Sequence, residues 1–193
     1  LRRRYQEFIP GHRLSREILA TLISNDLVNR MGPSFVRRIQ ADTGADVVTI
    51  ARAYTVARQV CQAGPLWKTI EELDNELPAT VQVLLLFEVS RSLRHASYWL
   101  IERFGNDLSI ESVVNRLKDN MHAVYTRTGS VMSIAARDQH ARAAEMYIEK
   151  GVPEKLAHRM SALLLTRPAL DMSDLAASYK PDDVLTLHSG KTV

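Results

Sequence analysis

Apolar residues recur at intervals of three and four along most of this chain, and a polar break follows each such run. Residues at these intervals share one face of a helix. Inside the first clear run, residues 15–31, Asn25, Asp26 and Asn29 are poor helix formers, so we expect contacts other than helix propensity to hold them. The apolar positions of this run are Ile18, Leu19, Leu22, Ile23, Leu27, Val28 and Met31.

The same periodicity predicts a series of helices with short connections, because glycine and proline separate the apolar runs. Runs of alternating β-branched residues are missing, so no sheet is expected. The longest run, 78–104, contains VQVLLLFEV, which is apolar on nearly every side. The sequence thus predicts an all-α fold, an irregular bundle of about eight helices around a central apolar helix at 78–104. The other expected helices lie at about 15–31, 33–43, 46–62, 64–73, 109–125, 130–150 and 153–166, with a last short turn capped by Ser173.

The length of 193 residues suits one domain or two small ones. The chain opens LRRRYQEF without an initiating methionine, and we interpret it as a piece of a longer protein. We expect an N-terminal linker at 1–14 from an upstream domain and a first helical subdomain at 15–104. A second helical subdomain is expected at 105–181, followed by a weakly ordered tail at 182–193.

Positive charge is concentrated near the N-terminus, where residues 1–60 carry ten arginines against five acidic residues, although the net charge is only +3. A basic region can attract nucleic acid. The helix, glycine and helix at 33–60 also resemble a helix-turn-helix, whose second helix would present Thr49, Arg52 and Arg58 to DNA. A DNA-binding module is therefore the alternative function, although solvated surface is the commoner meaning of such charge.

Several kinds of active site lack their sequence signature. A dinucleotide site needs closely spaced glycines, and the nearest two, Gly32 and Gly44, are twelve residues apart. The tail 189–192, SGKT, lacks the glycine of a phosphate-binding loop at Leu185, and no two histidines lie closer than eighteen residues. The single cysteine, Cys61, suits a reducing cytoplasm. We expect no catalytic, cofactor-binding or metal-binding residue in this chain, and no membrane partner.

Four sequence blocks resemble the C-terminal helical region of the large NAD-specific glutamate dehydrogenases of bacteria. The agreement is good from about His12 to Arg103 and patchy after that, where GVPEKLA at 151–157 continues it. The composite N-x-x-V-N-R-x-G, then T-G-A, then L-W-x-x-I-E-x-L-D-N is specific in this order. The blocks are REILATLISNDLVNRMG (16–32), FVRRIQADTGAD (35–46), IARAYTVAR (50–58) and LWKTIEELDNELPATVQ (66–82).

This resemblance implies a parent enzyme that oxidises L-glutamate to 2-oxoglutarate and ammonia with NAD. The catalytic lysine and aspartate of that family, and its Rossmann glycines, lie upstream of this region, so the chain is expected to be inactive alone. The implied partners are the upstream catalytic and dinucleotide-binding domains of the same chain, in a homo-oligomer.

Six polar residues are candidates for a network that supports such an enzyme. One hypothesis is that they tie this region to other domains or subunits, with Arg30 and Asp74 paired. The other is that they fix helix junctions within this region, because buried polar groups must be paired. Trp67 is interpreted as a core or interface anchor. The six residues are Asn25, Asn29, Arg30, Arg52, Asp74 and Asn75.

Overall fold

The computed structural model of the protein describes residues 11–126 and 133–179. Most of the predicted linker (1–10), the segment 127–132 and the predicted tail with its SGKT sequence (182–193) lie outside the described residues.

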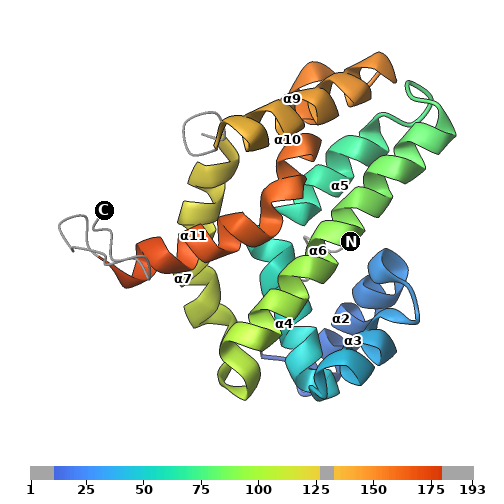
Figure 1. The fold of residues 1–193 in the computed structure, drawn as a ribbon. Helices are drawn as coiled ribbons and strands as arrows, with labels where there is room; N and C mark the ends of the chain where they lie inside the picture. The colour runs from blue at the N-terminus through green and yellow to red at the C-terminus, as the bar shows by residue number, and fades with distance from the viewer. Residues whose placement is uncertain (1–10, 127–132, 180–193) are drawn as a thin grey trace.

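The all-α prediction is confirmed for the described part of the chain, which contains helices and no strand (Figure 1). Most helices begin and end within two residues of the predicted positions. They are α2 (Ser15–Met31), α3 (Phe35–Thr43), α4 (Val47–Val60), α5 (Ala63–Glu72), α6 (Ala79–Phe104), α7 (Ile110–Thr126), α9 (Ile134–Glu149), α10 (Glu154–Ala162) and α11 (Thr166–Ser178), with short 3-10 turns at Gly105–Asp107 and Leu163–Leu165.

Helix α4 occupies the middle of the fold. It packs against α6 and α7, and α2, α3 and α5 also contact it. Its start is fixed by Asp46, whose carboxylate accepts a hydrogen bond from the Thr49 backbone N–H at 2.9 Å, as expected of an N-cap. Residues on several sides of α4 are buried, among them Ile50, Tyr54 and Val60. This helix of moderate length is therefore enclosed on several sides.

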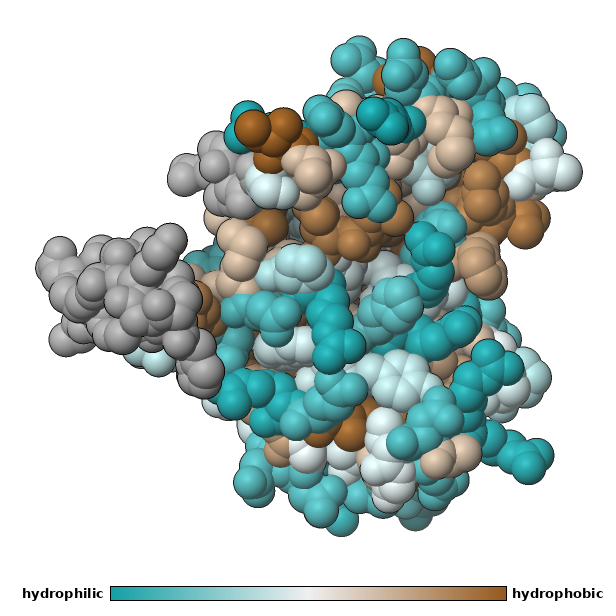
Figure 2. Space-filling view, viewed as in Figure 1, coloured by the Kyte–Doolittle hydropathy of each residue, from teal (hydrophilic) through white to brown (hydrophobic). Residues whose placement is uncertain are grey.

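Helix α6 is enclosed less completely than its apolar sequence predicts. Leu93 and Leu100, in its C-terminal half, are fully buried, whereas Val83 and Phe87 are 64% and 54% exposed. Figure 2 shows hydrophobic surface over the N-terminal half of this helix. In VQVLLLFEV only one stripe faces the core, and no other described helix covers the side that carries Val83 and Phe87. Helix α6 contacts α3, α4, α5, α10 and α11, but its N-terminal half is less enclosed than its apolar sequence predicts.

Helix α2 likewise buries little of its predicted apolar face. Of the seven apolar residues in that face only Leu27 is buried, while Leu19, Leu22 and Val28 are exposed. The helix contacts α4, and its sequence carries more apolar residues than that contact covers.

The last helix is longer than the predicted turn at Ser173. Helix α11 begins at Thr166. Pro168 is tolerated there because it lies in the first turn, where a missing backbone N–H costs no helical hydrogen bond. Ser173 is buried inside the helix and donates to the Ala169 carbonyl at 2.6 Å. Asp174 pairs with Arg103 of α6 at 2.9 Å and with Arg116 of α7 at 2.7 Å. The pairing fastens α11 to both helices.

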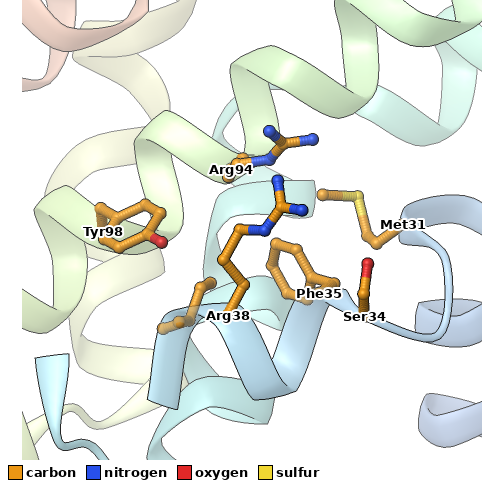
Figure 3. A pocket seen from close by; sticks show the side chains of 7 residues that line it. Met31, Ser34, Phe35, Arg38, Arg94 and Tyr98 are labelled. Carbon is orange, nitrogen blue, oxygen red and sulfur yellow. The ribbon is translucent and has the colours of Figure 1, made fainter. Parts of the chain in front are cut away.

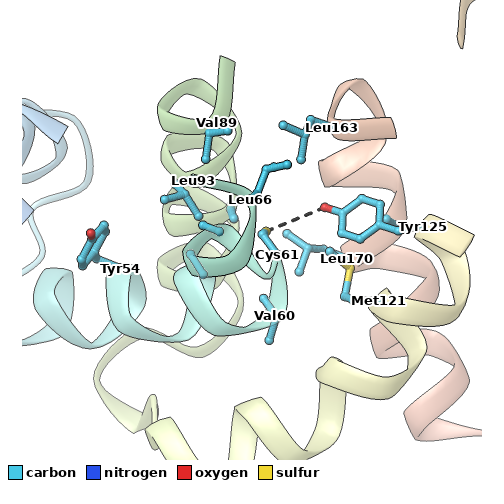
Figure 4. Close-up of a cluster of buried hydrophobic side chains, with 14 of the residues drawn as sticks. Tyr54, Val60, Cys61, Leu66, Val89, Leu93, Met121, Tyr125, Leu163 and Leu170 are labelled. Carbon is cyan, nitrogen blue, oxygen red and sulfur yellow. Dashed lines mark hydrogen bonds between the residues drawn. The ribbon is translucent and has the colours of Figure 1, made fainter. Parts of the chain in front are cut away.

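Buried side chains from both predicted subdomains form one core (Figure 4). Cys61, Val89 and Leu93 from the first range lie with Met121 and Leu170 from the second. The division at residue 104 stays a prediction, and no break in the hydrophobic core marks it.

Candidate functional site

The six predicted network residues do not gather at one place. Arg30 is half-buried, and the other five are exposed. Within residues 11–126 and 133–179 no side-chain hydrogen bond or ion pair joins any two of them. Asn75 has a left-handed backbone conformation with φ of 70° in the turn between α5 and α6, which asparagine tolerates better than most residues. Its position therefore has a conformational explanation.

Arg30 is paired with Glu71 rather than with Asp74. Glu71 lies in the last turn of α5, whereas Asp74 follows the end of that helix. The backbone carbonyl of Arg30 also accepts a hydrogen bond from Ser90 of α6 at 3.0 Å. The end of α2 is thus attached to two helices that come much later in the sequence.

Trp67 of α5 is the centre of a cluster of charged groups. It is buried, as interpreted from the sequence, and two guanidinium groups lie over its ring. The Cζ atom of Arg30 is 4.7 Å from the ring centroid, and that of Arg58 is 5.9 Å away. Such cation–π contacts contribute about 0.5–2 kcal/mol each. Two cations from different helices, α2 and α4, therefore share one aromatic ring.

Asp26 and Tyr54 complete this cluster. The Tyr54 hydroxyl donates to the Asp26 carboxylate at 2.7 Å, and Arg58 lies 3.3 Å from the same carboxylate. Burial raises the pKa of Tyr54, and the bond to Asp26 raises it further. We call Asp26, Arg30, Tyr54, Arg58, Trp67 and Glu71 the Trp67 cluster.

Sequence reasoning singled out Arg30 and Trp67 of this cluster and expected contacts to hold Asp26 in its helix. Tyr54 is buried, and a buried hydroxyl requires a partner. That requirement was the available signal, but a separation of 28 residues gives no way to name Asp26 as the partner. The contacts of Asp26 with Tyr54 and Arg58 explain how this poor helix former is retained in the middle of α2.

A small cavity lies beside α3, where Arg38 of α3 and Arg94 of α6 point toward the same space (Figure 3). Its volume of about 20 Å³ holds one water molecule and excludes a larger ligand. On its wall, the Tyr98 hydroxyl donates to Asp42, and burial is the main cause of the raised pKa of Tyr98. The cavity can stabilise a small negative group but cannot enclose a substrate.

Cys61 is unsuited to nucleophilic catalysis. It is fully buried, and burial raises the pKa of its thiol to about 11, so the reactive thiolate is scarce at neutral pH. Tyr125 donates to its sulfur at 3.8 Å (Figure 4). Arg159 lies 4.0 Å above the Tyr125 ring and donates to the Cys61 carbonyl at 2.7 Å. This arrangement joins α4, α7 and α10.

The DNA-reading face suggested for residues 33–60 is contradicted by the structure. Thr49 is buried and bonded to Asp46, and Arg58 is occupied in the Trp67 cluster. Only Arg52 of the three proposed contact residues is exposed and free of an ion pair within the described chain. Because α4 is enclosed by its neighbours, it cannot enter a major groove as a recognition helix does.

No group of three metal-ligating side chains lies together among the described residues. None of the described helices is long and apolar enough to span a bilayer.

Comparisons with known proteins agree on one family. Residues 1–187 match the family described as glutamate dehydrogenase, C-terminal. The chain is similar to the NAD-specific glutamate dehydrogenase of Halomonas elongata, with 36% identity over 162 residues, covering 84% of this chain and 10% of the relative. The corresponding protein of Pseudomonas aeruginosa is 32% identical over 178 residues, covering 91% of this chain and 11% of the relative. That of Mycobacterium tuberculosis is 28% identical over 172 residues. The chain thus spans about one tenth of the length of these curated relatives.

Proposed function

This chain belongs to the glutamate dehydrogenase C-terminal family, and from that membership we propose that it is the C-terminal helical segment of an enzyme that oxidises L-glutamate with NAD. The observation that carries the proposal is the match over residues 1–187 together with relatives that are named NAD-specific glutamate dehydrogenases. The products would be 2-oxoglutarate, ammonia and NADH. The fully buried thiol of Cys61 supports a segment that contributes no cysteine nucleophile.

We propose further that the segment acts by packing against other domains of the same polypeptide. Val83 and Phe87 lie four residues apart on α6, so their exposed side chains form one apolar ridge. Exposed apolar surface of this kind marks an interaction site more often than isolated apolar residues do. The upstream catalytic and dinucleotide-binding domains are the proposed occupants, in a homo-oligomer in the cytoplasm.

The test uses the full-length polypeptide that contains this sequence. Purified enzyme should form NADH from glutamate and NAD, and the double variant Val83→Ser, Phe87→Ser should lower the activity and loosen assembly in size-exclusion chromatography. The same variant of the isolated segment should keep its stability, because both side chains are already exposed. Lys118→Ser, at an exposed position of α7, is the matched control.

Two results would count against the proposals separately. A wild-type polypeptide without glutamate-dependent NADH formation contradicts the enzyme assignment. An active enzyme whose activity and assembly are the same in the Val83→Ser, Phe87→Ser variant contradicts the docking role while leaving the assignment in place.

A further inference from the structure

A groove with a volume of about 400 Å³ runs between α5 and α10. On the α5 side its lining residues are spaced as one helix face, and Leu66 and Leu156 form its buried apolar floor. The volume falls in the range of small-molecule sites, and it is about twenty times that of the cavity beside Arg38. The lining residues are Gln62, Pro65, Leu66, Thr69, Leu73, Pro153, Lys155, Leu156 and Arg159.

The polar side chains of this groove have one sign of charge. Lys155 and Arg159 contribute two positive charges, and no acidic residue lines the groove. Among the described residues neither cation forms an ion pair. An apolar groove with unpaired cations favours a ligand that combines an apolar body with a negative group.

Arg159 is held in place before any ligand arrives. Its Nη2 donates to the Cys61 carbonyl at 2.7 Å, and its guanidinium lies over the Tyr125 ring. Its other terminal nitrogen, Nη1, is buried without an acceptor among the described residues. A buried donor without a partner is costly, and a nearby negative charge would offset that cost. The groove therefore has a positive group that is already fixed at its wall.

The connection between α4 and α5 is also constrained. Gln62 has a left-handed backbone conformation with φ of 55°, which is uncommon for a residue other than glycine. Its side-chain nitrogen lies 2.9 Å from His122 Nδ1 of α7. Backbone strain of this kind persists only where surrounding contacts enforce it. The contact with α7 therefore sets where α5 begins, and with it one wall of the groove.

We propose that this groove binds a small amphipathic monoanion, an aliphatic carboxylate whose chain lies on Leu66 and Leu156 and whose carboxylate faces Lys155 and Arg159. The volume favours such a small molecule over an acidic helix from another protein, which would need a longer apolar channel. The proposal concerns this chain alone and does not depend on the reaction of the parent enzyme.

The test is calorimetric titration of the full-length polypeptide with octanoate and, separately, with octanamide. The two probes share an apolar body and differ in charge, so octanoate should bind about tenfold more tightly. Thr69 is exposed on the groove wall, and Thr69→Trp should abolish binding by filling the space. Lys155→Gln should weaken octanoate binding about two- to fivefold, the effect of an exposed charge.

Lys68→Gln is the matched control for Lys155→Gln, because Lys68 lies on α5 but is 76% exposed and paired with Glu72 outside the groove. It should leave octanoate affinity within about twofold of the wild type. Circular dichroism establishes that each variant is folded before titration. Absence of saturable octanoate binding overturns the proposal. Equal affinity for octanamide, or binding that survives Thr69→Trp, also overturns it, as does tighter binding of an acidic amphipathic peptide in the same groove.

Discussion

The sharpest prediction concerns two carboxylates that join the same pair of helices. Asp174 of α11 bonds Arg103 of α6 and Arg116 of α7, and its side chain is only 10% exposed. Glu102, beside Arg103 on α6, pairs with Arg167 of α11 at 2.9 Å, with both side chains more than half exposed. The two carboxylates differ in burial and in the number of arginines they pair with, so Asp174→Ala and Glu102→Ala compare a buried carboxylate with an exposed one.

The expected losses in free energy of unfolding follow from the burial and the number of partners of each carboxylate. Removing Asp174 deletes two charge-assisted hydrogen bonds, each worth about 1.5–3 kcal/mol. Water recovers part of this loss, since the side chains of Arg103 and Arg116 are 53% and 34% exposed. We expect a net cost of about 2–4 kcal/mol in the free energy of unfolding, somewhat below that of breaking a fully buried pair. Glu102→Ala should cost about 0–1 kcal/mol, as exposed pairs do.

The assay is urea denaturation of the 193-residue chain, followed by circular dichroism at low and high salt. The two variants should differ by at least about 1.5 kcal/mol in free energy of unfolding, with similar dependence on urea concentration. High salt should narrow the difference between wild type and Glu102→Ala, which depends on exposed charges. Equal losses in the two variants would refute the reasoning that burial and the second arginine strengthen the pairing of Asp174.

Three other predictions concern single residues. Tyr54→Phe removes the hydrogen bond to Asp26 and should lower the free energy of unfolding by about 1–2 kcal/mol in the same assay; an unchanged urea midpoint would contradict it. Burial raises the pKa of Cys61 to about 11, so a thiol reagent at pH 8 should label the native chain only as fast as it opens, and immediate labelling would show an accessible thiolate. Burial lowers the pKa of His140, so the unfolded chain binds its proton more readily and stability should fall as the pH drops below about 6.5. His140→Gln should make this fall shallower, and an unchanged slope would remove His140 as its cause.

The helices were predictable because each depends on local pattern. Glycine and proline mark their ends, and the spacing of apolar residues marks their inner faces. Helix α11 was predicted only as a short turn capped by Ser173, whereas it begins at Thr166 and Ser173 lies inside it.

The degree of enclosure was less predictable than the helices themselves. An apolar sequence shows how much surface a helix could bury, and it does not show how much the remaining helices cover. This is the reason that α6 and α2 were expected to be more buried than they are, and that the sequence did not show how many helices surround α4.

The Trp67 cluster shows a similar limit at the level of side chains. The sequence indicated that Arg30 needed an acidic partner, and several carboxylates were available between residues 71 and 76. Choosing Glu71 over Asp74 requires knowledge of where α5 ends and which way its last turn faces. Packing decides which of several neighbouring carboxylates pairs with an arginine, and the sequence pattern alone does not predict that choice.

The central position of α4 has a consequence for synthesis of the chain. Its last residue is Val60, while α7, which covers another of its sides, ends at Thr126. Ribosomes add about 5–20 residues per second, so this apolar surface of α4 waits several seconds before its partner exists. During that interval the nascent chain exposes apolar surface that can bind other proteins. Slow translation between these two helices would lengthen its exposure to chaperones and to neighbouring nascent chains.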